Sequence, residues 1–191
     1  MIKVIYETFD HNVHDVSKVA KLVYDVDFRT FDMLFKTPES AVKAIARDLP
    51  KRGLGDYFKV ILDDGGEIIG ILMVYNARVS HRFYLKSPKL LIVDILDHFA
   101  LADIEDDDLY LAEIAIDSEL RGRGIGRKVV CDVIDYARSK DYKRVTIDAD
   151  FRNHGAKRLY EKIGFRVFNK KSVKIRNFER GMYNMELLLK Q

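Results

Sequence analysis

The sequence contains one cysteine in 191 residues, Cys131, so it can form neither an intramolecular disulfide nor a cluster of thiolate metal ligands. It also lacks long apolar runs, and no stretch approaches the roughly 18 apolar residues that span a bilayer. The first ten residues, MIKVIYETFD, carry charges where a signal peptide needs an apolar segment. These absences exclude a disulfide scaffold and a membrane partner, and they predict a soluble, cytoplasmic protein.

A large excess of one charge is also missing. The net charge is only +3 and the isoelectric point is about 8.8, which is too weak to indicate nucleic acid as the partner without a basic face. Hydrophobic residues make up 48% of the chain and charged residues 33%, so a core can form. With no repeat, low-complexity tract or linker in sight, the length predicts one domain over residues 1–191.

The first part of the chain predicts a strand, two helices and a hairpin. Residues 2–6 are strand-like, and apolar residues recur at helical spacing between Val16 and Tyr24. A second helix is expected from Pro38 to about Leu49, with Thr37 as its N-cap. Two β-rich runs, residues 57–64 and 67–76, are joined by Gly65 and Gly66, which is a strong turn signal.

The segment 77–108 is harder to assign and is interpreted as an insertion. A helix over residues 89–102 is one possibility, and the acidic run from Glu105 to Asp108 is expected to be a solvated loop. After it the pattern is clearer. We expect strands at 109–116, 144–150, 165–175 and 182–190, a helix from the end of the glycine-rich loop to about Lys140, and a short helix at 153–162 ended by Gly164.

Residues 121–130, RGRGIGRKVV, place three glycines and four cations between a predicted strand and a predicted helix. Glycine costs about 1 kcal/mol relative to alanine inside a helix, so its repeated use at a helix start needs a reason. The first N–H groups of a helix have no partner within it, and the helix dipole adds positive charge there. Because glycine lets a phosphate approach the backbone closely, the stretch predicts an anion site; a surface turn without a ligand is the alternative.

Two common phosphate-binding motifs do not fit this stretch. A P-loop requires Lys-Ser or Lys-Thr after its last glycine, whereas Arg127 and Lys128 follow Gly126. A dinucleotide-binding loop requires G-x-G-x-x-G near the start of a βαβ unit, whereas the spacing here is G-x-G-x-G, far along the chain.

A second motif, NHGAKRLYEKIGF, occupies residues 153–165. The pattern R-x-x-G-x-G, at Arg121, Gly124 and Gly126, followed by N-x-x-A-x-x-L-Y-x-x-x-G-F, resembles the GNAT superfamily of acyl-CoA N-acyltransferases. The resemblance covers residues 109–168, and the final strand is similar to the closing strand of that family. It implies an α+β fold with a mixed, mostly antiparallel sheet of six to seven strands flanked by helices.

The resemblance also implies acetyl-CoA as the cofactor. In that family the glycine-rich loop holds the coenzyme A diphosphate on backbone amides. The preceding strand pairs with the pantetheine arm and polarises the thioester carbonyl, where a lost hydrogen-bond donor can cost about 3 kcal/mol. The family's asparagine bonds the pantetheine and its alanine packs on the cofactor. Carried over, the cofactor-binding residues are Ile114, Ala115, Ile116, Arg121, Gly122, Arg123, Gly124, Ile125, Gly126, Arg127, Lys128, Asn153, Ala156 and Tyr160.

Three catalytic candidates follow from the same resemblance. Tyr160 matches the family's acid for the departing thiolate. Asp148 is similar in position to the glutamate base of ribosomal-protein N-terminal acetyltransferases, and Glu113 lies just before the thioester-binding strand segment. A base is needed because an amine with a pKa near 10.4 is protonated at pH 7, and removing that proton costs about 4–5 kcal/mol. Deprotonation through water, without one essential base, is the alternative.

The amine acceptor cannot be identified from the sequence, and a small molecule or a peptide amine would suit the family. Residues 25–37 and 77–108 would form its site, with acids or aromatic residues as contacts: Asp25, Asp27, Asp32, Asp106, Asp107, Asp108, Phe28, Phe31, Phe35 and Tyr84. We expect a monomer or a homodimer. A non-catalytic acyl-CoA-binding domain of the same fold is the alternative function, which Tyr160, Glu113 and Asp148 disfavour. A nucleic-acid binder would explain the arginines but not the glycines.

Cys131 and the histidines are not expected to carry chemistry. Cys131 lies in the predicted helix and is interpreted as a small buried hydrophobe, since a covalent mechanism would need a nearby histidine. His154 is better explained as a helix-start residue, and the other histidines show no metal-ligand spacing, so no metal site is expected.

Overall fold

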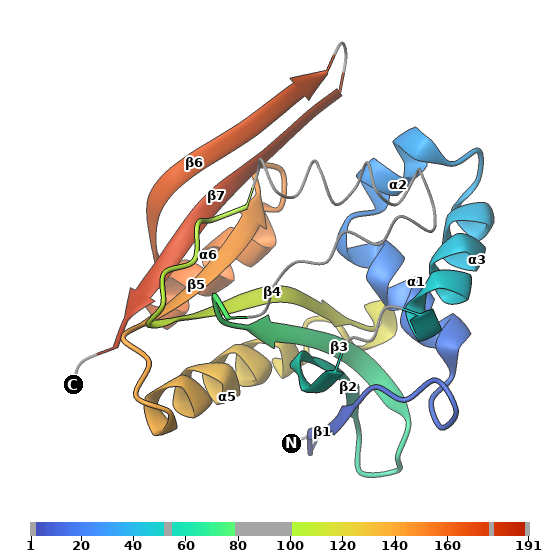
Figure 1. The fold of residues 1–191 in the computed structure, drawn as a ribbon, viewed down its shortest axis with the longest axis horizontal. Helices are drawn as coiled ribbons and strands as arrows, with labels where there is room; N and C mark the ends of the chain where they lie inside the picture. Colours follow the sequence, from blue (N-terminus) through green and yellow to red (C-terminus); the bar gives the residue numbers. More distant parts are fainter. Residues whose placement is uncertain (1–2, 52–54, 79–100, 176–177, 190–191) are drawn as a thin grey trace. The chain divides into compact units, whose positions relative to one another are not determined.

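The structure is a computed structural model that describes residues 3–51, 55–78, 101–175 and 178–189 (Figure 1). Its strands are β1 (Ile5–Thr8), β2 (Phe58–Leu62), β3 (Ile68–Tyr75), β4 (Asp108–Ile116), β5 (Arg144–Asp150), β6 (Arg166–Ile175) and β7 (Phe178–Leu188). Its α-helices are α1 (Val16–Val26), α2 (Phe28–Leu34), α3 (Pro38–Asp48), α5 (Ile125–Ser139) and α6 (His154–Ile163). Three short 3-10 helices are η1 (Leu49–Lys51), η2 (Gly55–Tyr57) and η3 (Ser118–Leu120).

The strands form one seven-stranded sheet with the order β1-β2-β3-β4-β5-β7-β6. Strand β4 pairs with β5 in parallel, whereas the β1–β2, β2–β3, β5–β7 and β6–β7 pairs are antiparallel. The sheet is therefore mixed and mostly antiparallel, which confirms the α+β class expected from the sequence.

The chain divides into two compact units. The first unit comprises residues 1–73, 83–93 and 113–126, and the second comprises residues 74–82, 94–112 and 127–191. The strand β4 contributes its first residues to the second unit and its last residues to the first. The glycine-rich loop therefore belongs to the first unit, and most of α5 belongs to the second.

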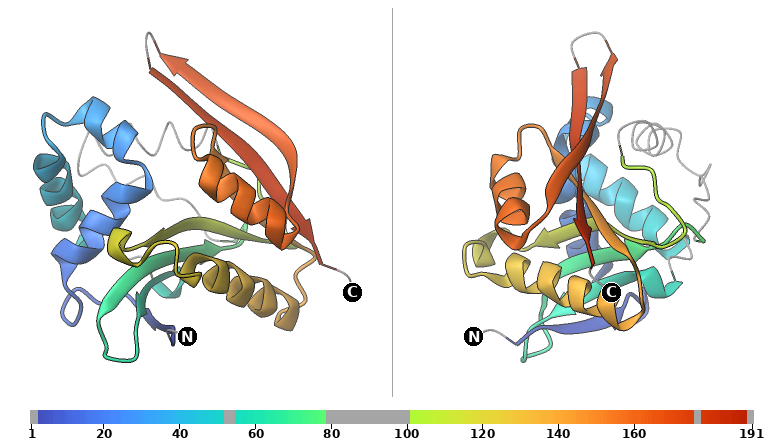
Figure 2. Two further views of the ribbon diagram at one scale, coloured as in Figure 1. Left: turned by 180° about the vertical axis from the view of Figure 1, so that it is seen from behind. Right: turned by 90° about the vertical axis from the view of Figure 1, so that its left-hand side faces the viewer.

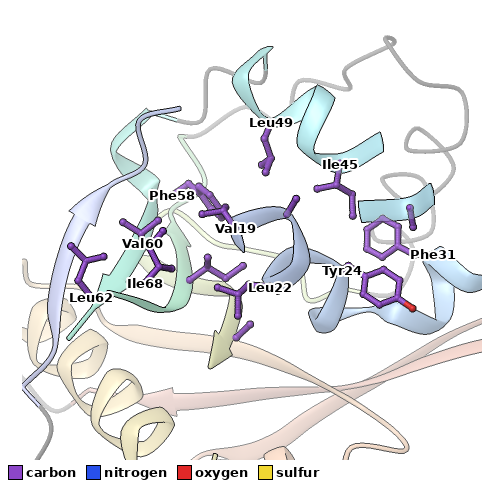
Figure 3. Close-up of a cluster of buried hydrophobic side chains, with 14 residues drawn as sticks. Val19, Leu22, Tyr24, Phe31, Ile45, Leu49, Phe58, Val60, Leu62 and Ile68 are labelled. Carbon is purple, nitrogen blue, oxygen red and sulfur yellow. The ribbon is translucent and has the colours of Figure 1, made fainter. Parts of the chain in front are cut away.

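The first unit is built around an apolar core between helices α1 and α3 and strands β2 and β3 (Figure 3). Val19 of α1 and Val60 of β2 are fully buried in it. Helix α1 starts where the Asp15 side chain accepts hydrogen bonds from two backbone N–H groups, and α3 starts at a capping box on Thr37 followed by Pro38. Both helix starts agree with the sequence signals, because these caps satisfy N–H groups that the helix leaves without acceptors.

Strands β2 and β3 form the predicted hairpin. The Asp63 carboxylate accepts hydrogen bonds from the backbone of Gly65 and Glu67, both at 2.9 Å, and closes the turn. Gly66 has φ +83°, a left-handed conformation that side chains of L-residues rarely adopt. The glycine pair is thus explained by the turn.

Helix α5, most of which belongs to the second unit, presents the predicted apolar stripe, and Ile125, Val129, Val133 and Ala137 are buried. The helix α6 begins at Asn153 as N-cap and ends at Gly164, whose φ is +118°. Strands β6 and β7 then form a long hairpin (Figure 2). All three elements match the expectations, although β7 begins at Phe178, four residues before the expected start.

Three expectations need correction. Residues 28–34, for which no helix is expected from the sequence, form α2. Phe31 packs against Tyr24 in the core, and this tertiary contact outweighs the weak local pattern. The first strand is β1 (Ile5–Thr8) rather than residues 2–6, because its ladder with β2 pairs Ile5 with Leu62. Asp108 is not part of a solvated loop: it begins β4 and is 2% exposed, since Arg144 neutralises it. The possible helix at 89–102 lies almost wholly outside the described residues.

Candidate active site

The glycine-rich loop has a conformation that only glycine adopts readily. Gly122 has φ +79° and Gly124 has φ +82°, and a Cβ added to either would meet no atom within 4 Å. Helix α5 begins immediately afterwards at Ile125, with Gly126 as its second residue. The loop therefore turns the backbone directly into a helix N-terminus and leaves open space beside its glycines.

The cations around this loop differ in their environments. The Arg121 guanidinium donates through Nε to the carbonyl of Ile116 at 3.2 Å, which ties the loop back to the end of β4. Arg123 and Arg127 are exposed. Lys128, by contrast, forms an ion pair with Asp132 one turn later in α5, at 2.8 Å. Arg123 and Arg127 are thus better placed to meet an anion from solution than Lys128.

The strand before the loop extends beyond its pairing with β5. The parallel ladder joins Asp108–Leu111 to Arg144–Ile147, and within the described residues β4 continues for five residues past the end of this ladder, to Ile116. The backbone groups of these last residues are therefore not taken up by β5. Ile114, Ala115 and Ile116, the predicted thioester-binding residues, all lie in this extension.

A glycine that sequence reasoning missed supports the same strand. A Cβ added to Gly70 of β3 would lie 2.5 Å from the carbonyl oxygen of Ala115 and 2.9 Å from Ile116 Cδ1. Two residues along, the Asp117 N–H donates to the Ile69 carbonyl at 2.9 Å. A glycine within a strand signals a close backbone approach, and this signal was available in the sequence.

Tyr160 lies on α6 and is buried, with 6% of its surface exposed. Burial raises the pKa of its phenol above the ordinary value, and the negative charge of Asp148 raises it further. No hydrogen bond joins the hydroxyl to any residue that the structure describes. Tyr160 therefore keeps its proton at neutral pH and has a donor to offer.

Asp148 of β5 belongs to a buried polar cluster. Its Oδ2 accepts hydrogen bonds from the Tyr110 hydroxyl at 2.6 Å and the Ala102 N–H at 3.1 Å. Its Oδ1 accepts one from the Asn184 amide at 2.6 Å. Burial raises the pKa of the Asp148 carboxyl, and these donors oppose that rise. The structure thus places Asp148 and Tyr160, both predicted as catalytic, in the same unit and within electrostatic reach.

This cluster belongs to a larger surface of the sheet, the polar sheet face, on which strand register aligns residues of β4, β5 and β7. Arg144 bonds Asp108 through Nε at 2.7 Å and Glu186 through Nη1 at 3.1 Å. Thr146 is fully buried, and its hydroxyl has no hydrogen-bond partner among the described residues. The polar sheet face comprises Asp108, Tyr110, Arg144, Thr146, Asp148, Asn184 and Glu186.

The remaining predicted site residues lie on two elements. Glu113 is partly buried on β4 and belongs to the first unit. The Asn153 side-chain oxygen accepts from the Ala156 N–H at 3.0 Å as the N-cap of α6. This cap uses only the amide oxygen and leaves the amide nitrogen for other contacts. Cys131 is partly buried on α5, more open than expected for a core residue.

Phe151, a bulky residue two positions before Asn153, is accommodated by a glycine far away in the sequence. Its backbone N–H donates to the Gly181 carbonyl at 2.9 Å, and any Cβ on Gly181 would clash with the Phe151 ring. The ring also packs against Tyr183, with 4.6 Å between centroids. Gly181 of β7 thus provides the room that the large side chain requires, which sequence spacing alone does not reveal.

Several residues proposed for the acceptor site are already engaged. Asp25 pairs with Lys21 at 2.5 Å, and Asp32 accepts from the Tyr24 hydroxyl at 2.7 Å. Asp107 pairs with Lys143. Phe31 is buried, whereas Phe28 is 43% exposed. Phe28 and the exposed Asp106 therefore remain the better candidates, and Tyr84 lies outside the described residues.

A comparison with family models gives a match to the acetyltransferase (GNAT) family over residues 23–165. The chain belongs to the GNAT family. This match includes both the glycine-rich loop and the motif around Asn153. Within the described part of this GNAT-family chain, no helix has the length and hydropathy of a membrane span, and no cluster of potential metal ligands occurs.

Individual relatives match over shorter segments. The chain is 34% identical over 61 residues to a probable N-acetyltransferase, camello, from Xenopus laevis, covering 32% of this chain and 28% of that protein. It is 33% identical over 58 residues to a putative [ribosomal protein bS18]-alanine N-acetyltransferase from Bacillus subtilis, covering 30% and 38%. These matches span roughly a third of the length of the curated relatives.

A solved structure agrees with this GNAT-family chain over nearly its whole length. The crystal structure of a putative phosphinothricin N-acetyltransferase superposes with a TM-score of 0.63 and 14% identity, covering 99% of this chain and 100% of that one. At this identity the agreement shows a shared fold.

Proposed function

We propose that this GNAT-family chain transfers an acetyl group from acetyl-CoA to a primary amine by direct attack within a ternary complex. The observation that carries the proposal is the run of the chain from β4 through η3 and the glycine-rich loop into α5. A strand that outlasts its ladder leads into a turn with two positive-φ glycines and then into a helix N-terminus. We further propose that residues 1–191 act as one domain, in the cytoplasm, as a monomer or homodimer.

The loop residues fit a diphosphate. The space beside Gly122 and Gly124 would be filled by any Cβ, and it is open to another group. The N–H groups in the first turn of α5 have no acceptor within the helix and lie at the positive end of its dipole. Exposed Arg123 and Arg127 add positive charge, whereas Arg121 and Lys128 are engaged with Ile116 and Asp132. These residues would hold the diphosphate, and bound acetyl-CoA supplies an activated thioester.

The extension of β4 would hold the rest of the cofactor. Backbone groups of Ile114, Ala115 and Ile116, beyond the ladder with β5, would pair with the amides of pantetheine as a neighbouring strand does. A backbone N–H aimed at the thioester oxygen would stabilise the charge that develops there during attack. The Asn153 amide nitrogen would donate to pantetheine, and Ala156 would pack against it.

The base must remove a proton from the ammonium group before nitrogen can attack. Asp148 suits this role because burial raises the pKa of its carboxyl toward that of the amine, which lowers the cost of the transfer. Glu113, on the extension of β4, is the second candidate, and a water chain is the third. A raised carboxyl pKa is the feature that favours Asp148.

Tyr160 would act on the departing sulfur. A thiol has a pKa near 8.5, whereas the pKa of the buried Tyr160 phenol lies above its ordinary value of about 10. Full transfer of the phenol proton to the thiolate is therefore uphill. Tyr160 would stabilise the thiolate by donating a hydrogen bond to it as the C–S bond breaks.

The acceptor is a small-molecule or a peptide amine. One relative is named as an alanine N-acetyltransferase of a ribosomal protein, which favours testing peptide amines alongside small amines. In the structure, the exposed Phe28 supports an acceptor with an apolar portion next to its amine.

The test is turnover of acetyl-CoA with panels of small amines and peptides, followed as free thiol. In Tyr160→Phe, kcat should fall by about 10²-fold or more, as for loss of a hydrogen-bond donor to charge that develops in the transition state, while the Kd for coenzyme A changes less than about twofold. Tyr136→Phe, on the exposed side of α5, is the control and should retain wild-type kcat. An unchanged kcat in Tyr160→Phe would remove this tyrosine from the chemistry. Tight coenzyme A binding without turnover on any amine would indicate an acyl-CoA-binding domain instead.

A further inference from the structure

Asp148 is held by donors from two different strands, and both donors are buried. Tyr110 of β4 is 1% exposed and Asn184 of β7 is fully buried. They contact different carboxylate oxygens, each at 2.6 Å. Two short hydrogen bonds from opposite neighbouring strands fix the plane of the carboxylate, because a rotation would stretch both.

The two oxygens are not equivalent. Oδ2 accepts from both Tyr110 and the Ala102 N–H, whereas Oδ1 accepts from Asn184 alone. A carboxylate has about four acceptor positions, so these three donors leave one, on Oδ1. A proton arriving from outside the cluster would therefore bind at Oδ1.

We infer that Tyr110 and Asn184 are positioning residues that orient the Asp148 carboxylate, leave Oδ1 to take a proton and set the proton affinity of the base. This inference rests on the proposed function. In the reaction an N–H bond of the acceptor ammonium breaks, its electron pair stays on nitrogen, and an O–H bond forms at Oδ1. The neutral amine then attacks the thioester carbon, and the C–S bond breaks with its electron pair on sulfur. The attacking nitrogen loses its second proton to this thiolate, so that the amide and the free thiol are formed.

The side-chain hydrogen-bond donors and the charged or titratable groups that act on Asp148 come from four elements. Tyr110 and Asn184 donate from β4 and β7, Tyr160 faces it from α6, and Lys171 acts from β6. Lys171 itself pairs with Asp103 at 2.9 Å. Burial raises the pKa of Asp148 most strongly, and the donors hold that rise in check. Removing a donor should thus raise the pKa further, since the charged form loses a hydrogen bond.

The test combines a direct titration with a pH–rate profile. In protein labelled with ¹³C at aspartate Cγ, the Asp148 signal is assigned by its absence in Asp148→Asn, and its pKa is measured in each variant. Tyr110→Phe and Asn184→Leu should each raise that pKa by about one unit, as expected for loss of a hydrogen bond to a charged group. The rising limb of kcat/KM against pH should move to higher pH by the same amount.

Thr146→Val is the matched control. It lies on the same face of β5, is fully buried, and loses a hydroxyl that has no partner among the described residues. It should leave both the Asp148 pKa and the rising limb unchanged. A merely structural role for Tyr110 predicts that Tyr110→Phe lowers the free energy of unfolding but leaves the Asp148 pKa and the rising limb of kcat/KM unchanged.

The outcomes separate this inference from the proposed function. An Asp148 pKa that is unchanged in both Tyr110→Phe and Asn184→Leu overturns the inference. A shifted pKa with a fixed rising limb also overturns it, because the base is then another group, although acetyl transfer stands. If no amine is acetylated, the proposed function fails, and the carboxyl titration still decides whether these two residues set the proton affinity of Asp148.

Discussion

The glycine-rich loop and the polar sheet face are built in opposite ways. The loop has its shape from backbone conformation, with φ near +80° at Gly122 and Gly124, open space beside them and exposed arginines. The polar sheet face is built from buried side chains that bond one another across β4, β5 and β7. A side chain can be removed from the loop without loss of the fold. On the polar sheet face, by contrast, the residues that set the proton affinity of Asp148 are also packed in the interior. Substitutions in the loop should therefore change cofactor binding separately from the free energy of unfolding. Substitutions on the polar sheet face should change function and the free energy of unfolding together.

The largest effect should come from Arg144→Met on the polar sheet face. This change leaves the Asp108 carboxylate, whose side chain is 3% exposed, buried without its cation, and it removes one of the two cations that pair with Glu186, whose side chain is 9% exposed. Breaking a buried pair in this way costs about 3–5 kcal/mol of unfolding free energy. Urea denaturation measures it. Arg166→Met, which removes a 68% exposed partner of Glu186, should cost less than about 1 kcal/mol. Equal losses in the two variants would contradict the coupling of this face to stability.

The next largest effect should come from an alanine at Gly124, and it distinguishes backbone strain from loss of coenzyme A binding. Gly124→Ala and Gly66→Ala place the same methyl group at φ +82° and +83°, each in open space. Both should cost about 1–2 kcal/mol in stability, because an L-residue is strained in the left-handed region. Calorimetry should show weaker coenzyme A binding for Gly124→Ala alone. Equal affinity in the two variants would mean that Gly124 serves the turn and not the ligand.

A smaller effect is expected from the loop cations. Arg123→Gln and Arg127→Gln should each weaken coenzyme A binding about threefold to tenfold, as for a lost charge-assisted contact in a partly screened site. The difference from wild type should shrink as salt is added. Arg138→Gln, at the far end of α5 and 58% exposed, should change neither affinity nor its salt dependence. Identical behaviour of all three variants would indicate a general charge effect and no local site.

The smallest effect is expected for Thr146→Val. Replacing a buried, unpartnered hydroxyl with a methyl group of similar shape should be neutral or stabilising by less than about 1 kcal/mol. Urea denaturation measures this difference. A loss of 2 kcal/mol or more, far outside the range for most neutral replacements, would show that this hydroxyl bonds within the polar sheet face.

Sequence patterns could predict the loop but not the polar sheet face, because the loop depends on residues that are close in the sequence and the face depends on residues that are far apart. Gly124, α5 and the Asn153 cap follow from local signals, since helix starts, turns and positive φ are determined by neighbouring residues. The pairing of Asp108 with Arg144, 36 residues apart, depends on strand register and burial. Because of this pairing, Asp108, which was expected in a solvated loop, is the first residue of β4.

The same limit explains what was missed at the candidate site. Asp148 is a candidate because its position resembles that of a family base, but its donors Tyr110 and Asn184 lie 38 and 36 residues away in the sequence. Gly181 of β7 leaves room for the ring of Phe151, the residue after β5, and this fit depends on residues 30 positions apart in the sequence. The helix α2 was overlooked because Phe31 is held by tertiary packing against Tyr24 and not by a local repeat.

The most direct test of the central claim is a crystal structure of the protein with coenzyme A bound. We expect the diphosphate on the backbone amides between Gly122 and Lys128, with the pantetheine along the extension of β4. A diphosphate bound elsewhere, or a loop that stays empty at saturating coenzyme A, would contradict the account and every role assigned from it.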